Sequence, residues 1–165
     1  MTSDDRERFQ ALLRQGTNLL REGKATDAIP LLVGAYGLDP ASLDAALNLG
    51  GSYIMAGQFN EAVPILEGLR GREPDNAMVW TNLGAAYLGN PVLATEKQQM
   101  RAITAFKQAL ELDPSAPSVA YNLGLIYRDR REWNKAKRWL RRAVRTNPQD
   151  QHARSLLERL ENAED

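Results

Sequence analysis

The stretch Ala46-Leu-Asn-Leu-Gly-Gly-Ser-Tyr53 occurs three times in this chain with small changes. It returns as Trp80-Thr-Asn-Leu-Gly-Ala-Ala-Tyr87 and as Ala120-Tyr-Asn-Leu-Gly-Leu-Ile-Tyr127. In each copy the spacing places Leu, Gly and Tyr on one side of a helix, with Asn on a neighbouring stripe. The stretch therefore predicts a repeated helix that buries the same face in every copy.

The copies recur with a period typical of paired helices. Gly16, Gly50 and Gly84 stand 34 residues apart, and the interval from Gly84 to Gly124 is six residues longer. A proline closes each period, because it disfavours a helical residue before it and cannot donate a hydrogen bond inside a helix. These prolines are Pro40, Pro74, Pro114 and Pro148. Each period therefore corresponds to two helices joined by a turn.

The repeated glycines need a structural reason, since a glycine inside a helix costs about 1 kcal/mol relative to alanine. The reason we expect is close approach of the partner helix's backbone. Each second helix carries a small residue, which we expect to complete this contact, and a large residue four positions later. The small residues are Ala28, Ala62, Ala102 and Ala136, and the large ones are Leu32, Leu66, Phe106 and Leu140.

This pattern resembles the tetratricopeptide repeat, and the resemblance covers the chain from about Phe9 to Pro148. The family signature is an aromatic or small residue, Leu-Gly, Tyr, two alanines around an aromatic or Leu, and a closing Pro. The third unit matches with Trp80, Leu83, Gly84, Tyr87, Ala102, Phe106, Ala109 and Pro114, and the fourth with Ala120, Leu123, Gly124, Tyr127, Ala136, Leu140, Ala143 and Pro148. The second unit departs at Leu69, and the first at Gln15 and Leu19.

The resemblance implies an all-α fold, a right-handed α-solenoid of four helix pairs that forms a single domain over residues 1–165. The repeats cover residues 9–40, 43–74, 77–114 with the six-residue insertion, and 117–148.

The two ends of the chain differ from the inner repeats. Over residues 150–162, Leu156, Leu157 and Leu160 fall on one stripe with charged residues opposite, which predicts a polar-backed capping helix. We expect residues 1–4 and the last few residues to fray.

The insertion lies between the two helices of the third unit. Thr95 and Gln98 have the spacing of a capping box, which predicts a helix over 96–112 after a protruding turn over residues 89–94. The second helices of the first two units carry Pro30 and Pro64 near their beginnings, which bar an earlier start; Thr104 stands at the matching place here. The turn is either a tolerated surface insertion or a contact arm for a partner.

Residues that carry chemistry are sparse. The chain has no cysteine, which excludes disulfides, thiolate metal sites and thiol catalysis. His152 is the single histidine, expected at the surface, so a His-based triad or a two-histidine metal site has no residues to build it. The glycines form no phosphate-binding loop. We therefore predict a non-enzymatic protein with no metal and no cofactor.

Composition and length fit one ordinary globular domain, with 165 residues of which 43% are hydrophobic and 25% charged. No apolar run approaches the roughly 18 residues of a membrane span, and residues 1–10 have no signal-peptide core. We expect a cytoplasmic protein without a membrane span.

The net charge of the chain is zero, but positive charge is concentrated in the fourth unit, where residues 117–148 include nine basic and two acidic residues. Its centre, Arg138, Arg141 and Arg142, is either a docking face for nucleic acid or another polyanion, or a solvated outer face. In the second case the acidic residues within 158–165 relieve its repulsion.

Asn48, Asn82 and Asn122 stand at one place of the repeat. In the resembling family the first helices line the concave face, and asparagines at this place can form a ladder that holds a peptide by its backbone. The apolar floor of that groove would consist of Leu47, Gly51, Met55, Met78, Ala85, Tyr121 and Leu125. The alternative role of the asparagines is to bond neighbouring helices or water.

The function we predict is a protein-interaction adaptor that binds an extended peptide or partner segment in this groove. The alternatives are polyanion binding through the fourth unit and self-assembly through the solenoid ends. A clamp for an acidic C-terminal carboxylate is not expected, because Leu13, Thr17 and Met78 stand where its basic residues would be.

Overall fold

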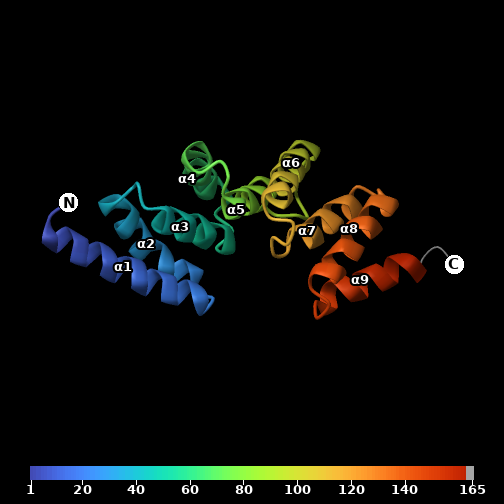
Figure 1. The fold of residues 1–165 in the computed structure, drawn as a ribbon, viewed down its shortest axis with the longest axis horizontal. Coiled ribbons are helices and arrows are strands. Elements are labelled where there is room, and N and C mark those ends of the chain that lie inside the picture. The colour runs from blue at the N-terminus through green and yellow to red at the C-terminus, as the bar shows by residue number, and fades with distance from the viewer. Residues whose placement is uncertain (163–165) are drawn as a thin grey trace.

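The computed structural model describes residues 1–162, and this part of the chain forms nine α-helices and no strand. Figure 1 shows how these helices follow one another along the molecule. The helices are α1 (Ser3–Arg21), α2 (Ala25–Leu38), α3 (Leu43–Met55), α4 (Phe59–Arg72), α5 (Ala77–Leu88), α6 (Glu96–Leu112), α7 (Val119–Asp129), α8 (Trp133–Thr146) and α9 (Gln151–Asn162). The predicted all-α solenoid of four helix pairs plus a capping helix is confirmed.

The helices build an arch with an inner and an outer layer. Each even-numbered helix packs against the odd-numbered helix before it and the one after it, and α1, α3 and α5 also pack side by side. Figure 1 shows α4 and α6 at the crown of the arch, with α1 and α9 at its two ends. The odd-numbered helices therefore form the inner layer of the first three units, and α2, α4 and α6 form the outer one.

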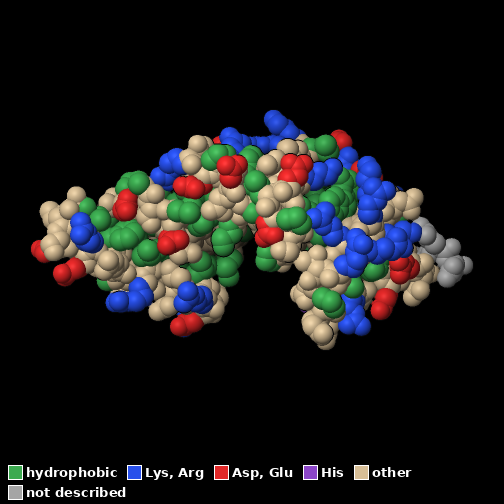
Figure 2. Space-filling view, viewed as in Figure 1, with side chains coloured by type: hydrophobic (Ala, Val, Ile, Leu, Met, Phe, Trp, Pro, Cys, Tyr) green, Lys and Arg blue, Asp and Glu red, His purple; other side chains and the backbone are tan. Residues whose placement is uncertain are grey.

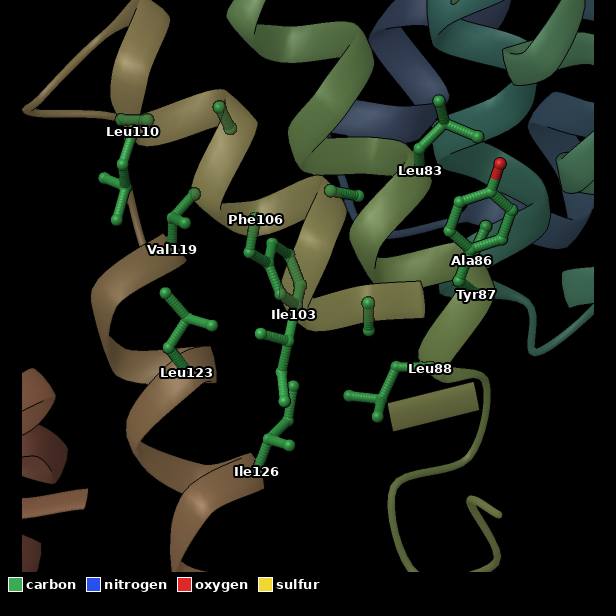
Figure 3. Packing of buried hydrophobic residues seen from close by; sticks show 14 of the residues in the cluster. Leu83, Ala86, Tyr87, Leu88, Ile103, Phe106, Leu110, Val119, Leu123 and Ile126 are labelled. Atoms are coloured by element: carbon green, nitrogen blue, oxygen red, sulfur yellow. The ribbon is translucent and has the colours of Figure 1, made fainter. Parts of the chain in front are cut away.

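The core is continuous from the second unit to the fourth. Phe106 of α6 is fully buried between Leu83 of α5 and Leu123 of α7, in one cluster of apolar side chains (Figure 3). Burial of an apolar side chain of this size stabilises the fold by roughly 1.5–3 kcal/mol. Because this cluster joins consecutive units, none of these units buries its apolar face alone.

The atoms nearest to a side chain added at the repeated glycines belong to the large residue of the second helix and not to the predicted alanine, although at Gly124 the backbone N of Leu140 also lies at 3.5 Å. A Cβ atom added to Gly16 would lie 2.6 Å from Cγ of Leu32, and one added to Gly124 would lie 2.8 Å from the Leu140 side chain. The large residue of each second helix thus occupies the glycine's open side. The alanine four positions earlier is fully buried in every unit, but it makes a different contact.

The inserted segment has the predicted form. Helix α6 begins at Glu96, and the Thr95 hydroxyl accepts from the Gln98 backbone N–H while the Gln98 side chain accepts from the Thr95 backbone N–H. The turn before it protrudes, since the Val92 side chain is 90% exposed. The capping box therefore sets where this helix starts.

The role predicted for the prolines in helix starts is wrong. Pro30 and Pro64 lie inside α2 and α4, five residues after each helix begins. Helix α8 has Arg138 at the matching place and begins in the same register. The turn that precedes each helix, and not the proline, therefore decides its first residue.

The predicted fraying of residues 1–4 is also wrong, because α1 begins at Ser3. The Thr2 hydroxyl accepts from the Asp5 N–H at 3.1 Å, and the Asp5 carboxylate accepts from the Thr2 N–H at 3.0 Å. The bond from the Thr2 backbone N–H to the carboxylate, and after it the Thr2 side chain, hold the pKa of Asp5 below its ordinary value.

The capping helix α9 ends the stack as predicted. It starts where the Asp150 carboxylate accepts from the Ala153 N–H at 3.0 Å, and it buries Ala153 and Leu156. The rest of its length is mostly exposed and polar. Residues 163–165, on which the predicted fraying of the chain's end falls, lie outside the described residues.

Candidate functional site

Two of the three repeated asparagines lie on the inner layer, and the third lies on the first helix of the fourth unit. Asn48 is in α3, Asn82 in α5 and Asn122 in α7, and each is half-buried. Figure 2 shows the molecule hollowed below the crown of the arch, between its two halves. The second, third and fourth units therefore each carry one amide side chain at the same place of the repeat, where the first unit has Arg14.

The three amides differ in what they contact. The Asn48 amide N–H donates to the Thr17 hydroxyl at 2.9 Å, and that hydroxyl donates to the Leu13 carbonyl at 2.7 Å. The side chains of Asn82 and Asn122 make no hydrogen bond within residues 1–162. Gly51 and Ala85 stand at the places that match Thr17, and neither offers a polar side-chain atom. Two of the three amides are therefore free to bind a ligand.

The apolar residues predicted for the groove floor all lie on α3, α5 and α7, the first helices of their units, and none is fully buried. Met55 and Met78 are the most exposed, at 58% and 60%. Leu47 and Ala85 also pack against the core. Tyr121 packs beside Ala153 and lines a cavity of about 260 Å³ with the loop 114–118.

The remaining two floor residues differ in what surrounds them. A Cβ atom added to Gly51 would meet no atom within 4 Å, so this inner surface is open to a ligand backbone. Leu125 of α7 is half-buried one helical turn after Tyr121.

The basic residues predicted as one patch are only partly together. Arg138 and Arg141 line a cavity of about 590 Å³ beside Leu157 of α9. Arg142 faces elsewhere: its guanidinium donates to the Pro114 carbonyl at 3.1 Å and lies 5.5 Å from the Trp139 ring centroid. Arg145 takes its place in the cavity. Including Arg142 in this patch was therefore wrong, because its direction on α8 points it to the preceding unit.

The predicted relief of this charge by acidic residues has one described example. The Arg141 guanidinium forms an ion pair with Glu161 of α9, with a shortest N–O distance of 2.7 Å. Arg138 and Arg145 form no ion pair within residues 1–162. Figure 2 shows blue side chains gathered on the side where α8 lies. The basic surface is therefore only partly neutralised by the described acidic residues.

Side chains suited to metal binding are dispersed over residues 1–162. His152 is exposed in the first turn of α9, as predicted. Among residues 1–162, no three His, Asp or Glu side chains lie where they could hold a metal ion. No helix in the same range is long and apolar enough to cross a membrane.

Sequence reasoning missed the bond of Thr17 to Asn48 and left Arg145 out of the basic patch. Thr17 follows Gly16 directly and therefore lies at a fixed place of the repeat. Aligning the first unit with the second would have predicted that it lies beside Asn48. Arg145 follows Arg138 by seven residues, which is two helical turns, whereas Arg142 follows it by four and lies on a neighbouring stripe.

The sequence profile of the tetratricopeptide repeat matches residues 19–86 and 95–160, which is most of the chain. The chain belongs to the tetratricopeptide repeat family. Tetratricopeptide repeat proteins are generally non-enzymatic and bind other proteins. No protein of curated function matches the sequence.

Solved structures share the fold. TTC0263, a thermophilic tetratricopeptide repeat protein of Thermus thermophilus, is 24% identical, with 94% of this chain and 82% of that chain covered and a TM-score of 0.80. A MamA protein is 22% identical, covering 96% and 83%, with a TM-score of 0.74. MamA of Desulfovibrio magneticus RS-1 is 22% identical, covering 92% and 76%, with a TM-score of 0.67. At these identities the likeness concerns the fold alone.

Proposed function

We propose that this tetratricopeptide repeat protein is an adaptor that binds an extended segment of a partner protein along the inner layer of the arch. The observation that carries the proposal is that the Asn82 and Asn122 side chains are half-buried and have no hydrogen-bond partner within residues 1–162. A half-buried polar group without a hydrogen-bond partner has lost part of its hydration, so a hydrogen bond from a ligand lowers its free energy.

An asparagine side chain suits a peptide backbone, because it offers both an N–H donor and a carbonyl acceptor. It can pair with a backbone carbonyl and N–H whatever side chains the peptide carries. Asn48 gives one N–H to Thr17 and keeps its second N–H and its carbonyl oxygen for a ligand. The asparagines thus bind the backbone of the peptide at successive positions and contribute affinity that does not depend on its side chains.

The floor between the amides supports close approach and adaptable contact. Gly51 and Ala85 have small or no side chains in the middle of the face, so a ligand backbone can come near. Met55 and Met78 are flexible and apolar, which suits varied partner side chains. Choice between partners would come from these apolar contacts.

The test compares two double variants against a captured partner. Affinity capture from the native cell lysate with mass spectrometry supplies the partner, and calorimetric titration measures its affinity. Asn82→Ala with Asn122→Ala removes two hydrogen bonds of about 1 kcal/mol each, so affinity should fall by roughly thirtyfold. The matched control, Asn60→Ala with Asn134→Ala, changes exposed asparagines of α4 and α8 and should leave affinity unchanged. Undiminished affinity in the folded first variant would show that the groove is not the site.

A second candidate function is polyanion binding along α8. It is favoured by Arg138 and Arg145, which line one cavity with Arg141 and have no ion pair in the described part of the chain. Six of the fourteen residues of α8 are basic and none is acidic. Such a face attracts nucleic acid or acidic surfaces at low salt.

A further inference from the structure

A separate hollow of about 390 Å³ opens on the outer side of the arch. Helices α4 and α6 both pack on α5 but are not a closely packed pair themselves, so side chains of α5 form the floor between them. The lining residues are Arg70, Trp80, Tyr87, Lys97, Met100, Arg101, Thr104 and Ala105. They come from all three helices, which makes the hollow a feature of tertiary structure.

Its two aromatic walls are held in place by hydrogen bonds. The Trp80 indole N–H donates to the Pro74 carbonyl at 2.6 Å, and the Tyr87 hydroxyl donates to the Glu67 carboxylate at 2.7 Å. Burial of the phenol, with this bond to Glu67, raises the pKa of Tyr87 above its ordinary value. The polar ends of both rings are therefore satisfied.

The hollow carries an excess of positive charge. Arg101 lies 3.9 Å from the Tyr87 ring centroid and forms an ion pair with Glu67 at 3.1 Å. Arg70 lies 6.0 Å from the Trp80 ring centroid. Neither Arg70 nor Lys97 has an ion pair within residues 1–162. Arg70 also donates to the Tyr87 hydroxyl at 3.5 Å, but this partner is neutral, so the charges of Arg70 and Lys97 are not neutralised by the described residues.

The combination departs from the repeat pattern at several positions together. Where this unit has Trp80, the neighbouring units have Ala46 and Ala120. Helix α6 begins three residues earlier in the repeat than α2, α4 and α8 do, and Lys97 lies in that added turn. The insertion thus places Lys97 in a helical turn that the other units lack.

We propose that this hollow is a second binding site, which takes a carboxylate side chain and an adjacent apolar side chain from an acidic segment of a partner protein. Arg70 and Lys97 would bind the carboxylate, and a guanidinium can do so with two parallel hydrogen bonds. Trp80 and Met100 provide the apolar contact. The site faces outward, so it does not depend on the groove of the inner layer.

A peptide fits this charge distribution better than a nucleic acid does. A polyphosphate needs positive charge over several successive phosphates. Here Glu67 binds Arg101 and Tyr87 beside the hollow, and Glu96 stands at the start of α6, so carboxylates interrupt the positive charge. A peptide whose carboxylates are separated by apolar residues can place one carboxylate on the cations of the hollow and keep its other carboxylates away from Glu67 and Glu96.

Nuclear magnetic resonance of the Trp80 indole N–H gives a readout specific to this site. Its resonance is identified by its absence from Trp80→Phe. The probe is a blocked nine-residue peptide of alternating glutamate and leucine, and the comparison peptide has glutamine in place of glutamate. The acidic peptide should shift the Trp80 resonance saturably below about 1 mM, and the glutamine peptide should not.

Two matched double variants complete the test. Arg70→Ala with Lys97→Ala should weaken binding of the acidic peptide at least tenfold. Arg72→Ala with Lys107→Ala removes the same charge from exposed places on α4 and α6 outside the hollow, and binding should stay within about twofold. Asn82→Ala with Asn122→Ala should leave this binding unchanged, which separates the site from the groove.

Three outcomes would overturn the proposal. The first is an unmoved Trp80 resonance with the acidic peptide, and the second is equal weakening by the two charge-matched double variants. The third is a shift of Trp80 by oligouridylate in the absence of any shift by the acidic peptide, which would assign the hollow to nucleic acid.

Discussion

The ring of Phe106 fills the space that a side chain on Gly84 would need. A Cβ atom placed on Gly84 would lie 2.5 Å from Cδ1 of Phe106, which is closer than carbon atoms approach. Phe106 is fully buried and has no free space into which to move. The glycine therefore determines how closely α5 and α6 pack.

Gly84→Ala should destabilise the protein, although alanine favours helix. Overpacking a core costs typically 1–3 kcal/mol, which exceeds the gain of about 1 kcal/mol in helix propensity. The midpoint of unfolding by urea should fall. Gly51→Ala is the matched control, because its added Cβ meets no atom within 4 Å, and it should raise the midpoint. A stabilised Gly84→Ala variant would contradict the role given to Phe106.

Removing α9 should lower stability and promote association. Deletion of residues 150–165 uncovers the apolar face on which Ala153 and Leu156 are buried. Melting temperature and size-exclusion chromatography with light scattering measure the two effects. An unchanged melting temperature in a monomeric product would show that α9 is not a cap, and would remove support for self-assembly through this end.

The basic surface of α8 should bind polyanions only at low salt if the second candidate function is right. Fluorescence anisotropy with oligouridylate should give an affinity that falls steeply as salt rises. Arg138→Glu with Arg145→Glu should abolish binding, since each places an acid in the cavity. Arg6→Glu with Arg8→Glu in α1 makes the same charge change and should have little effect. Failure of the unmodified protein to bind oligouridylate or acidic liposomes at low salt would exclude the function.

Thr95→Ala should unravel the first turn of α6. The Thr95 hydroxyl is the partner of the Gln98 backbone N–H, and loss of such a capping hydroxyl costs about 1 kcal/mol. Hydrogen exchange of residues 96–99 should accelerate. The control is Thr104→Ala, whose exposed hydroxyl bonds only to the Met100 carbonyl of its own helix, and exchange at the start of α6 should be unchanged. Equal exchange rates in the two variants would mean that the capping box does not hold this turn.

Local sequence was sufficient to predict a structural feature wherever that feature depends on residues close together in the chain. The capping box of Thr95 and Gln98 is an example, because its two partners are three residues apart. The start of α1 at Ser3 has the same kind of signal in Thr2 and Asp5. It was overlooked because the end of a chain was expected to fray.

The periodic sequence by itself determined the helix pairs, their stacking and the capping helix, because the same apolar face recurs at every period and has to be buried by the next unit. Only the tertiary structure decided which side chains meet between units. The bond from Asn48 to Thr17 joins residues 31 apart, and the ion pair of Arg101 with Glu67 joins residues 34 apart. Such pairings depend on the distance and rotation between neighbouring helices, which are set by side chains as large as Phe106 packing against glycine and which helical periodicity does not specify.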